Sequence, residues 1–79
     1  MTVDHEGKTP LYQQIAAILR GQIERGEITG RLPSETTLSQ QYGISRGTAR
    51  KAAGILISEG WARVSRGRGT FVVRPEDRK

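Results

Sequence analysis

Apolar residues recur at helical spacing through the first part of the chain. A first group follows at steps of four residues: Leu11, Ile15, Leu19 and Ile23. This spacing predicts an amphipathic helix over about residues 10–25. Thr9 and Pro10 form a helix-start signal, because a hydroxyl side chain can cap the first turn and proline needs no amide partner there. Gly26 supplies the left-handed residue that commonly ends a helix.

Two shorter helices are predicted after a connection rich in turn residues. Ser34 is placed to cap the first of them, which ends near Gly43. Ser45 is placed to cap the second, which covers about residues 46–59 and is followed by Gly60. Since a turn of only about three residues joins the two helices, they form a helix-turn-helix unit.

The pattern changes after Gly60 from helical spacing to short runs of aromatic and β-branched residues. Residues 61–64 and 70–73 have the composition of strands. The segment 65–69 between them contains glycine and is typical of a hairpin loop. The predicted fold is therefore mainly α, with three helices followed by a small antiparallel β-hairpin.

Length and composition limit what such a fold can do. The chain has 79 residues, of which 34% are hydrophobic, and it has one histidine and no cysteine. We expect one small domain at residues 10–74, between a flexible tail (1–9) and the start of a linker (75–79). Paired carboxylates and metal-ligand clusters are missing from the sequence, so we expect no enzyme activity and no cofactor. No apolar run approaches the roughly 20 residues that span a bilayer, so we expect no membrane partner and a cytoplasmic location.

Charge is segregated along the chain, whose formal net charge is +5. Residues 1–45 carry four basic and five acidic residues, whereas residues 46–74 carry seven basic residues and a single acid, Glu59. Six of those seven bases are arginine, whose planar fork suits phosphate and guanine. A basic surface that serves solubility is the alternative, but the segregation favours a nucleic-acid surface.

The helix predicted at 46–59 separates its residues into two faces. The core-facing side is expected to hold small residues and one leucine: Ala49, Ala52, Ala53 and Leu56. The outer side is expected to mix long bases with glycine: Arg46, Gly47, Arg50, Lys51 and Gly54. Bases in the first half of a helix interact unfavourably with the positive end of its dipole, so their placement here favours an anionic partner. In helix-turn-helix proteins the outer face of the second helix enters the major groove of DNA.

The predicted hairpin loop is the second basic feature. Arg66 and Arg68 flank Gly67, and arginine at such a tip can enter the minor groove. A plain glycine turn with solvated arginines is the alternative. A phosphate-binding loop of a nucleotide enzyme fits poorly, because a strand follows here instead of a helix.

These segments together resemble the GntR family of bacterial transcription regulators, in its N-terminal winged helix-turn-helix DNA-binding domain. The motifs that carry the resemblance are Pro10-Leu11-Tyr12, Leu32-Pro33-Ser34-Glu35, Tyr42-Gly43-Ile44-Ser45-Arg46, Thr48, Arg50, Glu59-Gly60 and Gly67-Arg68-Gly69-Thr70-Phe71-Val72. Their details are most similar to the HutC-type branch. The resemblance implies three helices plus a wing, with the helix at 46–59 in the major groove and the wing tip at 65–69 in the minor groove.

The resemblance also implies roles for single residues. Arg46 and Arg50 match arginines that read bases, typically guanine. Ser45 and Thr48 match residues that bind phosphate or base edges, and Gly47 stands where the family often has a small polar residue. Thr36 stands where the family often has a DNA-contacting arginine. The full set of expected DNA contacts is Ser34, Thr36, Ser45, Arg46, Gly47, Thr48, Arg50, Lys51, Arg66, Gly67, Arg68 and Thr70.

Members of the family imply partners beyond this domain. We expect double-stranded DNA with a palindromic operator, a homodimer and repressor action in the full-length protein, and a location at the bacterial nucleoid. A small-molecule effector is expected only for a C-terminal domain that this sequence does not include. The alternative function is a winged-helix module that binds protein or RNA, although only 5% of residues are aromatic and could stack on unpaired bases.

Overall fold

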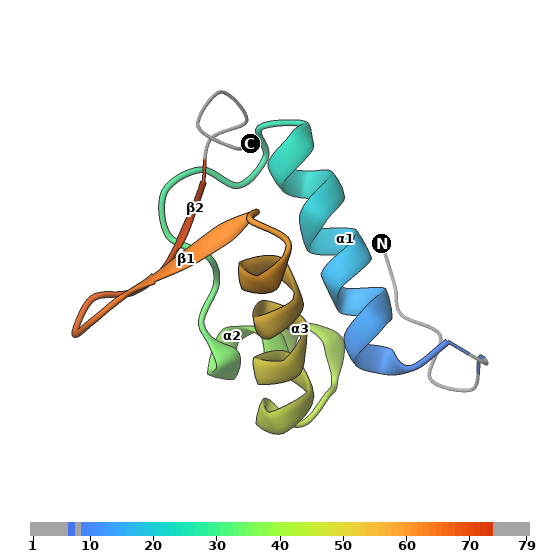
Figure 1. Cartoon of the computed structure of the whole chain (residues 1–79). Coiled ribbons are helices and arrows are strands. Elements are labelled where there is room, and N and C mark those ends of the chain that lie inside the picture. The colour runs from blue at the N-terminus through green and yellow to red at the C-terminus, as the bar shows by residue number, and fades with distance from the viewer. Residues whose placement is uncertain (1–6, 8, 74–79) are drawn as a thin grey trace.

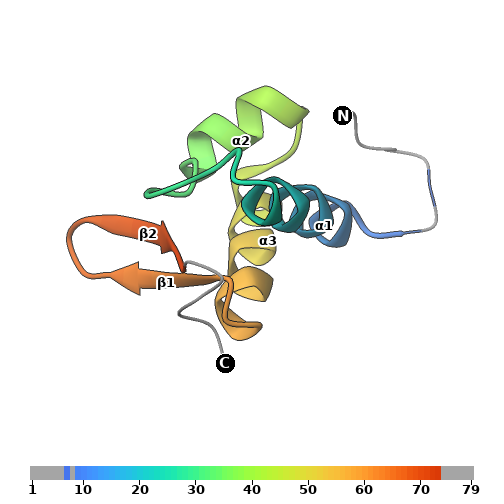
Figure 2. The same ribbon diagram turned by 90° about the horizontal axis from the view of Figure 1, so that it is seen from above.

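The computed structural model describes residue 7 and residues 9–73. Three helices come first: α1 (Leu11–Glu24), α2 (Glu35–Tyr42) and α3 (Arg46–Ser58). A hairpin of β1 (Ala62–Ser65) and β2 (Gly69–Val72) follows (Figure 1). The hairpin projects on one side of α3 and α1 lies on the other (Figure 2). This is the predicted winged helix-turn-helix arrangement; the predicted linker and most of the predicted tail lie outside the described residues.

The starts of α2 and α3 follow the sequence prediction. The Ser34 hydroxyl oxygen accepts the backbone N–H of Thr37 at 3.1 Å, and the Ser45 hydroxyl oxygen accepts that of Thr48 at 3.0 Å. Each bond satisfies an amide that the first helical turn leaves without a carbonyl partner. Gly43 ends α2 with φ 65, the left-handed geometry that glycine adopts without strain.

The predicted cap of α1 is wrong. Pro10 is the N-cap, and no side chain caps this helix. The carbonyl of Pro10 already accepts the backbone amides of Gln13 and Gln14, at 3.0 and 3.1 Å, so Thr9 lies one residue too early. Thr9 instead accepts a 2.7 Å bond from the Gln14 side chain through its backbone carbonyl.

The strands begin and end one residue away from their predicted bounds. Trp61 does not begin β1, because its N–H closes the end of α3 on the carbonyl of Leu56 at 2.8 Å. At the tip, Ser65 pairs with Gly69, so both belong to the ladder and the loop contains only residues 66–68.

A third extended segment, which the sequence did not predict, lies beside β2. The backbone of Arg31 forms a bridge with that of Phe71. On either side, the Leu32 N–H donates to the Thr70 carbonyl at 2.8 Å and the Val72 N–H donates to the Gly30 carbonyl at 2.6 Å. The connection between α1 and α2 therefore forms part of the wing sheet.

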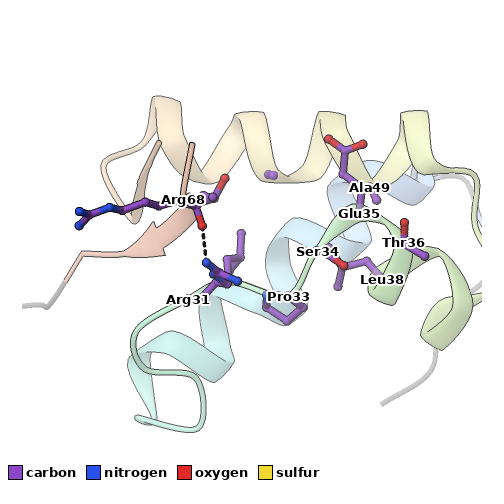
Figure 3. A pocket seen from close by; sticks show the side chains of 12 residues that line it. Arg31, Pro33, Ser34, Glu35, Thr36, Leu38, Ala49 and Arg68 are labelled. Carbon is purple, nitrogen blue, oxygen red and sulfur yellow. Dashed lines mark hydrogen bonds between the residues drawn. The ribbon is translucent and has the colours of Figure 1, made fainter. Parts of the chain in front are cut away.

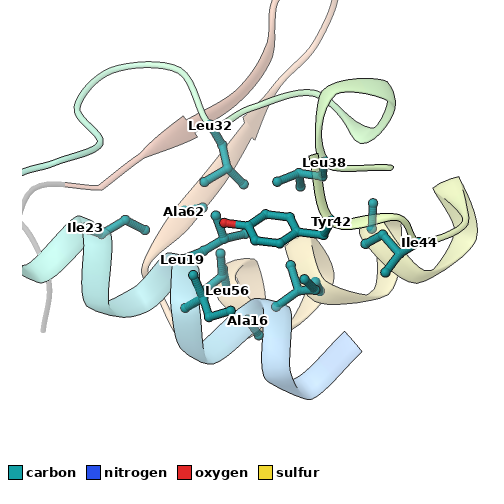
Figure 4. Close-up of a cluster of buried hydrophobic side chains, with 13 residues drawn as sticks. Ala16, Leu19, Ile23, Leu32, Leu38, Tyr42, Ile44, Leu56 and Ala62 are labelled. Atoms are coloured by element: carbon teal, nitrogen blue, oxygen red, sulfur yellow. The ribbon is translucent and has the colours of Figure 1, made fainter. Parts of the chain in front are cut away.

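The core lies where the three helices meet the base of the wing (Figure 4). Its largest fully buried side chains are Ile15, Leu19, Leu38 and Leu56. Leu32 and Ala62 join them from the wing side, which ties the hairpin to the helices. Ala49 and Ala52 are fully buried as predicted, but Ala53 is only half-buried, because it faces the space between α3 and the wing.

Candidate nucleic-acid interface

Helix α3 presents its basic residues to solvent, as the helical wheel predicts. Arg46, Gly47, Arg50 and Lys51 are all exposed. The opposite side is fixed, since its buried residues pack against α1 and α2. Arg46 has no ion-pair partner among the described residues, so its guanidinium is available to a ligand.

Two hydroxyls are linked at the start of α3. The Ser45 side chain donates to the Thr48 hydroxyl oxygen at 3.0 Å, while its own oxygen accepts the Thr48 N–H. The same arrangement occurs at the start of α2, where Ser34 donates to the Thr37 hydroxyl at 2.9 Å. Ser34 and Ser45 thus hold the two helix ends in shape in addition to any contact with a ligand.

Arg50 is held by an acid of the Leu32-Pro33-Ser34-Glu35 motif, Glu35, which is not among the expected DNA contacts. Its Nε and Nη2 donate to the two carboxylate oxygens of Glu35, each at 3.2 Å. Glu35 raises the pKa of the Arg50 guanidinium, first through these hydrogen bonds and then through its charge. The first residue of α2 therefore orients a side chain in the middle of α3.

Lys51 points to a different part of the molecule. Its ammonium nitrogen lies 5.7 Å from the centre of the Tyr12 ring, in the first turn of α1. Such a contact is a cation–π interaction. Lys51 therefore lies towards α1, whereas Arg50 lies towards α2.

The wing tip is an exposed turn of three residues. Arg66, Gly67 and Arg68 are all exposed, and the Arg68 N–H closes the turn on the Ser65 carbonyl at 3.0 Å. Gly67 has φ 75, a conformation that residues with a side chain rarely adopt. Thr70 is half-buried at the base of the turn, where its carbonyl bonds to Leu32.

A hollow of about 390 Å³ connects the wing with the start of α2 and the side of α3 (Figure 3). Four of the predicted contact residues line it: Ser34, Thr36, Arg68 and Thr70. Glu35 and Arg31 line it as well. The structure thus brings together predicted residues from α2 and the wing, whereas Arg46 and Gly47 lie at the start of α3 and do not line the hollow.

Arg31 is a second residue that is not among the expected DNA contacts. Its side chain donates a hydrogen bond to the backbone carbonyl of Arg68, drawn as a dashed line in Figure 3. Its guanidinium carbon lies 5.7 Å from the centre of the Phe71 ring. The sequence carries no signal for this role, because Arg31 is one of four bases in residues 1–45 and is not set apart from the others by its neighbours.

Two further features, a metal-binding group and a membrane-spanning helix, are absent from the described part of the chain. No three histidine, aspartate or glutamate side chains come together there as a metal-binding group. None of its helices is both long and apolar enough to cross a bilayer.

Comparison with known proteins identifies the family. The family model described as bacterial regulatory proteins, gntR family, matches residues 11–72. The HTH-type transcriptional repressor NagR of Bacillus subtilis is 41% identical over 78 residues, which cover 96% of this chain and 32% of NagR. The mannosyl-D-glycerate transport/metabolism system repressor MngR of Escherichia coli is 41% identical over 68 residues, which cover 84% of this chain and 28% of MngR.

Solved structures agree with this assignment. AraR(DBD) in complex with operator ORE1 has a TM-score of 0.78 at 38% identity, over 90% of this chain and 89% of that one. YtrA from Sulfolobus acidocaldarius, a GntR-family transcription factor, has a TM-score of 0.79 at 35% identity, over 92% of this chain and 78% of that one. The chain spans about a third of the length of NagR and MngR, and it belongs to the gntR family of bacterial regulatory proteins.

Proposed function

We propose that this domain binds double-stranded DNA sequence-specifically, with α3 in the major groove and the wing tip in the minor groove. One observation carries the proposal: α3 and the wing border the same hollow, and both present exposed arginines. Helix α3 has 13 residues and is therefore about 20 Å long, which suits a helix laid in the major groove.

The residues divide by the chemistry they offer. Arg46 and Arg50 present forked donors on α3, which match the acceptor pair of guanine. Ser45, Thr48, Ser34 and Thr36 present hydroxyls at the starts of two helices, which suit backbone phosphates. The remaining candidates, by their places at α3 and the wing, are Gly47, Lys51, Arg66, Gly67, Arg68 and Thr70.

The full-length protein is, in this proposal, a transcriptional repressor. NagR and MngR are named as repressors, and AraR(DBD) was solved on an operator. The proposal also includes a homodimer, whose two DNA-binding domains bind a palindromic operator. A further domain of the full-length protein would bind an effector. The HutC-type branch and a location at the bacterial nucleoid rest on the motif resemblance alone.

A protein-binding or RNA-binding module is the weaker alternative. Single-stranded RNA is usually held by exposed aromatic rings. Here Tyr42 is buried, and Tyr12, Trp61 and Phe71 are half-buried. The described surface therefore offers arginine forks for duplex grooves and lacks a stacking platform.

A selection from random-sequence duplex DNA tests the proposal. We expect enrichment of one sequence, and a log affinity for it that falls linearly with log salt, because bound cations are released from each phosphate contacted. If the domain enriches no sequence, and its affinity for duplexes does not respond to salt, the proposal is wrong.

A further inference from the structure

Glu35 is an acid in a surface that otherwise suits an anionic ligand. It occupies the first position of α2 and lines the hollow beside the wing. An acid at this point repels nearby phosphates, so its presence calls for a reason. A negative charge in the first turn stabilises α2 through the helix dipole, which is one reason. This effect does not require Glu35 to pair with Arg50.

The pairing with Glu35 leaves the outer end of the Arg50 guanidinium free to donate hydrogen bonds. A guanidinium carries five N–H donors, and the edge formed by Nε and Nη2 is the one that Glu35 occupies. The two hydrogens of Nη1 and the second hydrogen of Nη2 remain. Together Nη1 and Nη2 form an end-on fork, and the Arg50 side chain keeps 74% of its surface exposed.

We propose that Glu35 is a positioning residue that directs the end-on fork of Arg50 at the O6 and N7 acceptors of a guanine. The carboxylate accepts from one edge of the guanidinium while the base accepts from the other, so both contacts form at once. Glu35 also makes a phosphate an unfavourable alternative partner, because its own charge would face the phosphate. This inference rests on the proposed DNA binding.

The role has a signature that a merely structural residue lacks. If Glu35 positions Arg50, its loss lowers the preference for one guanine while affinity for unrelated duplexes stays the same or rises. A residue needed only for folding would lower affinity for all duplexes together. The two cases separate in the ratio of affinities for the selected duplex and for the same duplex with that guanine replaced by adenine.

The test compares E35Q with E59Q. Both substitutions remove one negative charge and keep the side-chain size, but Glu59 pairs with Arg20 of α1, at 3.5 Å, and not with Arg50. Selection with the wild-type domain and with R50A first identifies the base pair whose preference depends on Arg50. We expect that base to be guanine, and we expect E35Q to lower the affinity ratio there about tenfold while E59Q leaves it unchanged.

Two further variants keep the result unambiguous. R50K retains the charge, but its ammonium has three donors and no planar fork, so it cannot form two hydrogen bonds to Glu35 and two to a base, and it should lose the same preference as E35Q. In the R50A background, E35Q should have no further effect on the ratio. The inference is overturned if E35Q keeps the wild-type ratio, if it acts equally without Arg50, or if the dependent base is not guanine. A wild-type domain that selects no sequence would overturn the proposed function as well.

Discussion

Arg31 reaches across the base of the wing and donates a hydrogen bond to the backbone carbonyl of Arg68. The same guanidinium lies over the ring of Phe71, and the Arg31 backbone forms a bridge to that residue. The wing is therefore held by a residue that precedes α2 and lies outside the hairpin. Both this contact and the β1–β2 ladder therefore restrain the orientation of the wing tip.

Replacing Arg31 with alanine should loosen the wing. We expect a loss of about 1 kcal/mol in the free energy of unfolding, from the hydrogen bond and the cation–π contact together. Hydrogen exchange at Arg68 should be faster, because the turn loses its external support. Arg25→Ala is the control, since Arg25 pairs only locally with Glu27 at 2.6 Å. Equal exchange rates in the two variants would contradict the role of Arg31.

Arg46→Ala should weaken binding to the selected duplex by about 1–3 kcal/mol and relax the preference at one base pair. The reason is that its guanidinium has no ion-pair partner among residues 9–73 and so offers a complete fork to a base. Fluorescence anisotropy on the selected duplex and on a random duplex measures both quantities. Equal losses on the two duplexes would show that Arg46 binds phosphate instead.

Arg66→Ala should lower DNA affinity without changing the unfolding midpoint, because Arg66 is exposed at the wing tip. Arg63→Ala removes the same charge from an exposed position within β1, away from the tip. We expect the slope of log affinity against log salt concentration to decrease by about one for Arg66→Ala, and to stay unchanged for Arg63→Ala. An identical loss in both variants would point to general charge and not to a wing-tip contact.

Ser45→Ala should destabilise the domain by about 1 kcal/mol, because the first turn of α3 loses its cap. Ser58→Ala is the control, since Ser58 is exposed at the other end of the same helix. Urea denaturation of the two variants gives the comparison. If Ser45→Ala were no less stable than Ser58→Ala, the cap would contribute nothing in solution.

Two glycines should respond to alanine with opposite signs. Gly54 lies within α3, and a Cβ there meets nothing within 4 Å, so Gly54→Ala should stabilise the domain by about 0.5–1 kcal/mol. Gly43 has φ 65, so Gly43→Ala should destabilise it by about 1–2 kcal/mol. Thermal denaturation followed by circular dichroism checks both, and a shift of the same sign would contradict the backbone argument.

The sequence predicted local features well, because their causes are local. Ser34 and Ser45 each cap a helix within three residues, and the periodicity of α1 and α3 sets which side is buried. The predicted cap at Thr9 failed because proline can occupy either the cap or the next position, and the sequence does not decide between them.

What the sequence missed depends on contacts between distant positions. Arg31 meets Phe71 and Glu35 meets Arg50 only after the chain has folded, and no short-range pattern marks either pair. The arginines of the candidate site could be proposed from the sequence because they cluster along the chain. The residues that orient them were not, since each lies in an earlier segment.

The pairing of residues 30–32 with β2 has a consequence for protein engineering. A wing exchanged between two such domains at the hairpin alone would carry β2 without its neighbouring edge. The transplant would then meet a foreign Leu32 and Gly30, and its tip would settle at a new angle to α3. A transferable wing from this protein therefore consists of two separate stretches of chain, exchanged together.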